Sequence, residues 1–108
     1  MVNWSRVAQL KDEVGEDVFP EVIAIFIEET DEVAERIGPA ESLEADMHFL
    51  KGAALNLGLD DLAKLAAEGE AQAAGRAEGT PDVARVVATY QASRDALLEH
   101  AQTEGVAP

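Results

Sequence analysis

Apolar residues recur three and four positions apart in every long segment of this chain, and glycine and proline separate those segments. This spacing lines the apolar side chains along one side of an α-helix, whereas a half-buried strand requires strict alternation. The pattern predicts an all-α protein with a short leading helix and four main helices. Because the connections are short, we expect an antiparallel up-down-up-down four-helix bundle. The breaks lie at Gly15, Gly38-Pro39, Gly58, Gly75 and Gly79-Thr80-Pro81.

Capping residues predict where each helix begins and ends. The leading helix is expected over about residues 3–14, and Gly58 suits a left-handed end to the third helix. We expect residues 103–108 to be frayed. The predicted N-terminal caps of the four main helices are Asp17, Ser42, Asp60 and Thr80, with Pro81 at the first position of the last helix.

The composition limits the possible partners. The chain has 108 residues, which suits one domain over 1–108, and its 22 acidic and 8 basic residues give a net charge of −14. Such a charge argues against binding to nucleic acid or to an anionic membrane. Because cysteine is absent, disulfides, a thiol nucleophile and a zinc-thiolate site are excluded. The longest apolar run, Val22–Ile27, is too short to span a bilayer, so we expect a cytoplasmic protein. We also expect a monomer.

A small polar group interrupts the apolar pattern of the third predicted helix. His48 falls roughly 140° from the centre of the buried stripe, and Lys51 and Gly52 are its neighbours on the helix surface. Glycine inside a helix costs about 1 kcal/mol relative to alanine, so Gly52 beside an exposed imidazole indicates open access to that ring. The predicted buried stripe is Leu43, Met47, Leu50, Ala54 and Leu57.

The run Asp46–Gly58 resembles the histidine-containing phosphotransfer (HPt) domain of phosphorelays. It supplies a histidine, an apolar pair, lysine, glycine and two small residues, followed by asparagine, an apolar residue and glycine. Upstream, Phe26-Ile27-Glu28-Glu29 is similar to the family's second-helix motif. Downstream, Leu62, Leu65 and Glu70 fall where the next helix of the family carries leucines and an acid. The resemblance therefore covers roughly residues 18–70.

The resemblance implies a phosphocarrier rather than an independent enzyme. A neutral imidazole is a good nucleophile near neutral pH, and His48 is the candidate phosphoacceptor. Lys51 is expected to offset the charge of the phosphoryl group, and Gly52 to leave space for a partner's aspartate. Leu55 lies on the same side of the helix, either as a contact for that partner or packed against an adjoining helix.

The same resemblance predicts partners and excludes a cofactor. The expected partners are response-regulator receiver domains or a hybrid histidine kinase, with Mg²⁺ on the receiver and no cofactor on this chain. The sequence has no glycine-rich phosphate loop or other ATP-binding pattern, so another protein must phosphorylate His48. We expect a free-standing shuttle.

Three residues depart from the family pattern. Met47 stands where alanine is frequent, Ala53 where serine is common, and Gly69 where a larger apolar residue is usual. Gly69 leaves a space in the packing of the third main helix unless a bulky neighbour, such as Trp4 or Phe49, fills it.

Other interpretations of the sequence are possible. The alternative hypothesis is a non-phosphorylated docking module that binds a receiver or kinase. Such a module would be expected to lose His48 or Lys51. A di-metal carboxylate bundle would need glutamate-x-x-histidine pairs, which are absent. His100 is interpreted as a solvated surface residue. The acidic residues of the first main helix are interpreted as its polar face, and they are Glu28, Glu29, Asp31, Glu32 and Glu35.

Overall fold

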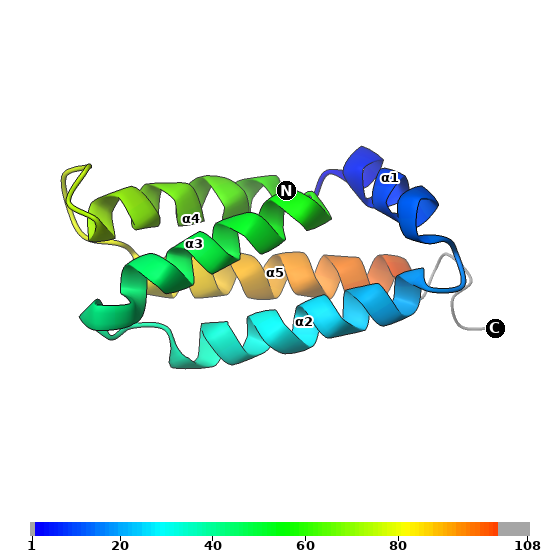
Figure 1. The fold of residues 1–108 in the computed structure, drawn as a ribbon, viewed down its shortest axis with the longest axis horizontal. Coiled ribbons are helices and arrows are strands. Elements are labelled where there is room, and N and C mark those ends of the chain that lie inside the picture. The colour runs from blue at the N-terminus through cyan, green and yellow to red at the C-terminus, as the bar shows by residue number, and fades with distance from the viewer. Residues whose placement is uncertain (1, 102–108) are drawn as a thin grey trace.

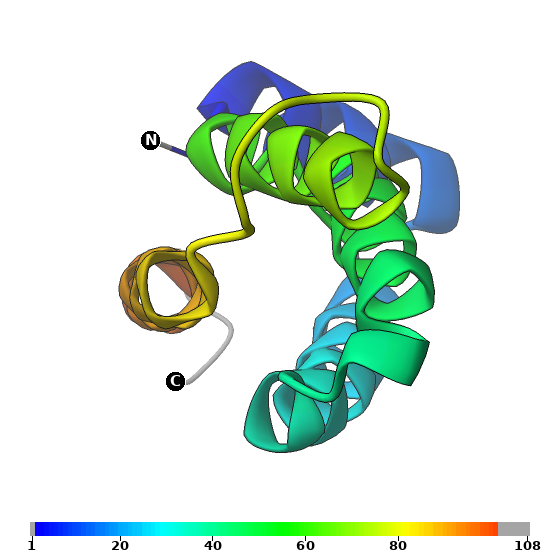
Figure 2. The same cartoon turned by 90° about the vertical axis from the view of Figure 1, so that its left-hand side faces the viewer.

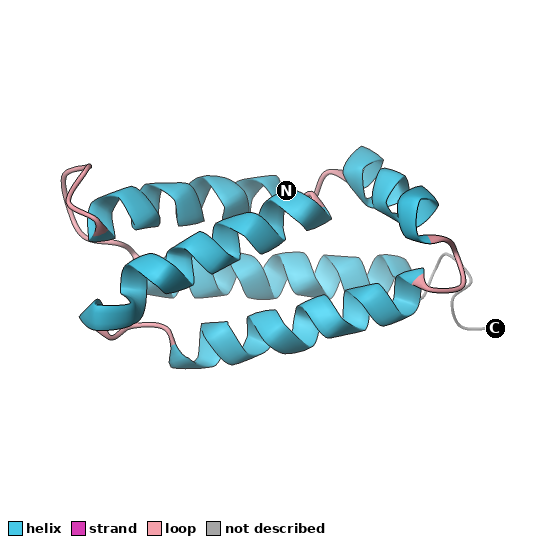
Figure 3. Cartoon of the chain, in the orientation of Figure 1, coloured by secondary structure: helices cyan, strands magenta, loops and turns pink. Residues whose placement is uncertain are grey.

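The computed structural model describes residues 2–101, all-helical apart from turns and one isolated backbone bridge (Figure 3). The predicted number of helices is confirmed within this range, whereas the fraying expected for 103–108 lies outside it. None of the described helices is long and apolar enough to cross a membrane. The helices are α1 (Trp4–Val14), α2 (Phe19–Arg36), α3 (Ala40–Leu57), α4 (Asp60–Ala73) and α5 (Val83–Ala101).

Helices α2 to α5 lie along the long axis of the molecule, and the chain reverses direction from each to the next (Figure 1). Seen end-on, the four helices surround a common centre (Figure 2). Helix α3 packs against α2 and α4, and α5 packs against α4 and α2. Helix α1 lies at one end, where it contacts α3 and α2.

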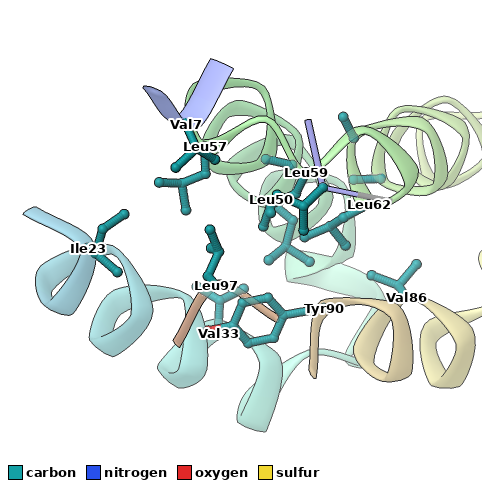
Figure 4. Close-up of a cluster of buried hydrophobic side chains, with 14 of the residues drawn as sticks. Val7, Ile23, Val33, Leu50, Leu57, Leu59, Leu62, Val86, Tyr90 and Leu97 are labelled. Atoms are coloured by element: carbon teal, nitrogen blue, oxygen red, sulfur yellow. The ribbon is translucent and has the colours of Figure 1, made fainter. Parts of the chain in front are cut away.

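The centre is filled by the side chains that the helical spacing predicts (Figure 4). In α3, Met47, Leu50, Ala54 and Leu57 are buried, and Leu43 is partly buried. In α5, Leu97 takes the inward position and its neighbour Leu98 is 41% exposed. Consecutive residues lie about 100° apart around a helix, so the two leucines cannot share one contact.

The predicted N-terminal caps are wrong for all four main helices. Helix α2 is preceded by Val18 and α3 by Pro39, neither with a side-chain cap, and Ser42 instead donates to the Pro39 carbonyl from within the first turn. Helix α4 is preceded by Leu59, so Asp60 is its first helical residue.

The last helix is capped two residues later than predicted. Asp82 Oδ1 accepts from the Arg85 backbone N–H at 3.0 Å, the geometry of an N-terminal cap. Thr80 and Pro81 therefore belong to the preceding loop.

The N-terminal segment closes the end of the bundle where α3 turns into α4. Gly58 has φ +74°, the left-handed conformation predicted for this helix end. Its carbonyl accepts from the Asn3 N–H at 2.6 Å, and Val2 pairs with Leu59 through the backbone. This long-range pairing holds Leu59 outside the helical conformation, at φ −87° and ψ 75°, and explains why α4 begins without a side-chain cap.

A polar cluster joins α5 to α2. The Tyr90 hydroxyl donates to Asp31 Oδ1 at 2.7 Å, and Arg94 donates to the same oxygen at 3.0 Å. Burial, followed by the neighbouring Asp31 carboxylate, raises the pKa of the Tyr90 phenol. Asp31 is thus an interhelical partner rather than only part of the polar face of α2.

The space at Gly69 is filled by neither Trp4 nor Phe49. Trp4 and Phe49 are 40% and 37% exposed. The side chain of the fully buried Met47 lies there instead: a Cβ at Gly69 would be only 2.8 Å from the Met47 sulfur. Met47 is larger, and Gly69 smaller, than the residue usual at each position in the family. These two departures therefore compensate for each other in volume.

Candidate functional site

His48 lies on the solvent side of α3, with 69% of its side chain exposed. Two residues close to it in the sequence, Met47 and Leu50, are buried and hold this part of α3 against the core. The inward stripe thus fixes the opposite placement of the imidazole.

The imidazole is held by a carboxylate from the next helix. His48 Nδ1 lies 2.9 Å from Oε2 of Glu70 on α4, and the Glu70 side chain is only 13% exposed. A carboxylate can only accept a hydrogen bond, so Nδ1 carries the proton in this arrangement. In the neutral ring Nε2 then has the lone pair, and it is the nucleophilic nitrogen.

Lys51 binds the other oxygen of the same carboxylate. Its Nζ lies 2.6 Å from Glu70 Oε1, and the Lys51 side chain is 32% exposed. Lys51, followed by His48, lowers the pKa of the Glu70 carboxyl by hydrogen bonding to its charged form. Glu70 is therefore an ionised bridge between the imidazole and the only lysine of α3.

Gly52 lies beside His48 in open space. A Cβ built at this position meets nothing within 4 Å. The local protein packing therefore does not require glycine here, although a helix interior disfavours it.

Leu55 continues the same side of α3 toward α1, and it is 60% exposed. It lines a broad open groove of about 730 Å³ between α1 and the end of α3. The exposed side chains of α1 form the other wall, which includes Ser5, Gln9 and Asp12. Of the two roles considered for Leu55, packing against an adjoining helix is disfavoured by this exposure.

His100 lies outside this group. His100 is not simply a solvated residue, because it is partly buried and its ring centroid lies 4.3 Å from that of Trp4. Among residues 2–101, no three histidine or acidic side chains are grouped so that they could hold a metal ion.

The contribution of Glu70 was not predicted from the sequence. Glu70 was recognised only as an acid at a family position, because its contact with His48 depends on how α3 and α4 are aligned. A usable signal existed: Leu62, Ala66 and Gly69 form the buried side of α4, which puts Glu70 at the edge of that side.

Comparison with known proteins gives one result. Residues 21–103 match the family model described as Hpt domain. No curated protein and no solved structure matches the chain. The match begins within α2, so α1 lies outside it.

Proposed function

Because the chain belongs to the Hpt domain family, we propose that it carries a phosphoryl group on His48 between receiver-domain aspartates, or from a histidine kinase. Hpt domains are phosphocarrier modules that act in phosphorelays and interact with receiver domains and kinases. They have no ATP site of their own. For this chain, the phosphoacceptor, its helpers and its partners are the proposal.

The observation that carries the proposal is the hydrogen bond between His48 Nδ1 and Glu70. With the proton held on Nδ1, the Nε2 lone pair attacks the phosphorus of an aspartyl phosphate. A bond forms between Nε2 and phosphorus, the bond from phosphorus to the aspartate oxygen breaks, and the electron pair leaves with that carboxylate. The ring becomes positively charged, and the ionised Glu70 at 2.9 Å from Nδ1 offsets that charge.

Lys51 and Gly52 serve the same transfer in this proposal. A phosphoryl group adds about two negative charges, and a protein of net charge −14 repels them. The Lys51 ammonium is one helical turn from His48 and supplies a local cation. The open space at Gly52 lets the partner's aspartate approach the imidazole in line.

The receiver is proposed to dock on the same side of α3 and on α1. Support comes from the exposure of Leu55, two helical turns from His48, and from the groove beside it. Mg²⁺ belongs to the receiver, and this chain supplies no cofactor. We further propose a cytoplasmic monomer built as an antiparallel up-down-up-down four-helix bundle with α1 added, which binds neither nucleic acid nor membrane.

Phosphoryl transfer from a loaded receiver domain tests this proposal. The wild type should remove label from the receiver in the presence of Mg²⁺, and His48→Gln should not. Leu55→Asp should slow transfer at receiver concentrations below saturation. Leu98→Asp is the matched control, since Leu98 is also an exposed leucine but lies on α5. Binding of the receiver without any transfer would instead support the alternative docking module.

A further inference from the structure

Met47 and Gly69 form a tight contact between α3 and α4. Met47 is completely buried, and a Cβ at Gly69 would lie 2.8, 3.2 and 3.3 Å from its Sδ, Cε and Cγ. Three atoms of one side chain thus lie against the bare backbone of α4. Any side chain at position 69 would compete with Met47 for this volume.

The contact lies next to the functional pair in both helices. Met47 immediately precedes His48, and Gly69 immediately precedes Glu70. Met47 and Gly69 are buried, whereas His48 is exposed and Glu70 lies at the edge of the buried side. A change in the separation or alignment of the two helices at the inner contact must therefore move the outer pair.

We propose that Met47 and Gly69 are positioning residues that set the hydrogen bond between His48 Nδ1 and Glu70. This inference rests on the proposed function, because it concerns how that site is prepared for transfer. A hydrogen bond of 2.9 Å weakens steeply with added distance or poor angle, so a small displacement of α4 releases Nδ1. The neutral imidazole then distributes its proton between the two nitrogens, and Nε2 is no longer always the nucleophile.

The proposal differs from a purely structural role in a way that can be measured. Alanine favours a helix more than glycine does, so Gly69→Ala alone gains local helix stability. Moving the bulk from α3 to α4 in the double variant Met47→Ala/Gly69→Leu refills the contact from the other side. If Met47 and Gly69 mattered only for total volume and stability, the tautomer of the His48 imidazole would be the same in every variant that folds.

The test is ¹⁵N NMR of the His48 imidazole in the unphosphorylated protein, which reports the tautomer without any receiver. The wild type should be almost entirely the Nδ1–H tautomer. Gly69→Ala and Met47→Ala should each shift the neutral ring toward a mixture, and the double variant should restore the wild-type signal. The control Ala88→Leu adds bulk on the exposed side of α5 and should change nothing.

A wild-type tautomer in both folded single variants would overturn the proposal. If either single variant does not fold, the comparison uses the other one and Met47→Leu, which nearly keeps the volume and should keep the wild-type tautomer. The result is independent of the transfer assay. Failure of the wild type to accept a phosphoryl group would refute the proposed function, whereas an unchanged imidazole signal would refute only the positioning role.

Discussion

The Lys51 ammonium lies 2.6 Å from Oε1 of Glu70, so in the unphosphorylated protein it is paired with a carboxylate. The other oxygen of that carboxylate holds His48 Nδ1. A phosphoryl group on Nε2 would offer Lys51 a second anion within one helical turn. In the proposed function, the same lysine organises the carboxylate before transfer and can turn toward the phosphoryl oxygens after it.

Lys51→Ala should slow phosphoryl transfer or shorten the lifetime of the phosphorylated protein without abolishing either, because the nucleophile remains. The rate is measured with a labelled receiver, and the lifetime by following the isolated phosphoprotein. Lys64→Ala, which removes an exposed lysine of α4, is the matched control. Rates and lifetimes equal to those of the wild type would remove the assigned role of Lys51.

The interactions of Glu70 should make stability depend on acidic pH. The pKa of Glu70 in the folded protein is lowered from the ordinary 4.5. Its contribution to the free energy of unfolding is therefore fully present above pH 4.5. The contribution is lost as the pH falls through the lower folded-state pKa. The melting temperatures of the wild type and Glu70→Gln, measured from pH 7 to pH 3, should therefore converge at the acidic end. Parallel curves would show that the carboxylate charge contributes nothing.

Replacing Gly52, within α3, and Gly58, at its C-terminal end, by alanine should change the free energy of unfolding in opposite directions. Gly52→Ala should raise the free energy of unfolding by about 0.5–1 kcal/mol, since the new methyl group meets open space. Gly58→Ala should lower it by more than about 1 kcal/mol, because φ is +74° and the Cβ would lie 2.8 Å from the Asn3 carbonyl oxygen. Chemical denaturation measures both.

Larger side chains at position 52 separate access from stability. Gly52→Gln should keep the fold while it blocks transfer, because its bulk projects beside the imidazole. Undiminished transfer by Gly52→Gln would contradict the access role.

Tyr90→Phe should lower the free energy of unfolding by about 1–3 kcal/mol, because Asp31 and the Ile27 carbonyl on α2 lose the hydroxyl donor that reaches them from α5. The variant should transfer phosphate at the wild-type rate, since the cluster joins α2 to α5 and contains no atom of the site on α3 and α4. Thermal melts together with the transfer assay check both expectations. A transfer defect in the folded variant would show that the cluster also influences the site.

The helical spacing predicted which side of α3 faces the core. Placing Met47 and Leu50 inward also placed His48, Lys51 and Gly52 outward. Periodicity gives the angle around one helix axis but not the alignment of two helices. The pairing of Glu70 with His48 and the contact of Met47 with Gly69 both depend on that alignment, which explains why neither was predicted.

The cap of α4 was mispredicted for a related reason. Asp60 is a good capping residue in isolation, but the backbone pairing of Val2 with Leu59 fixes the chain one residue earlier. That pairing joins residues far apart in the sequence. Local preferences cannot reveal it.

Intact-mass spectrometry at neutral or alkaline pH shows whether His48 carries the phosphoryl group. The chain is incubated with a phosphorylated receiver domain and Mg²⁺, with His48→Gln in parallel. We expect one added phosphate on the wild type alone, stable to base and lost in acid, with the helicity and melting of His48→Gln nearly unchanged. An adduct that persists in His48→Gln, or no adduct with any receiver or kinase that binds, would contradict this role of His48.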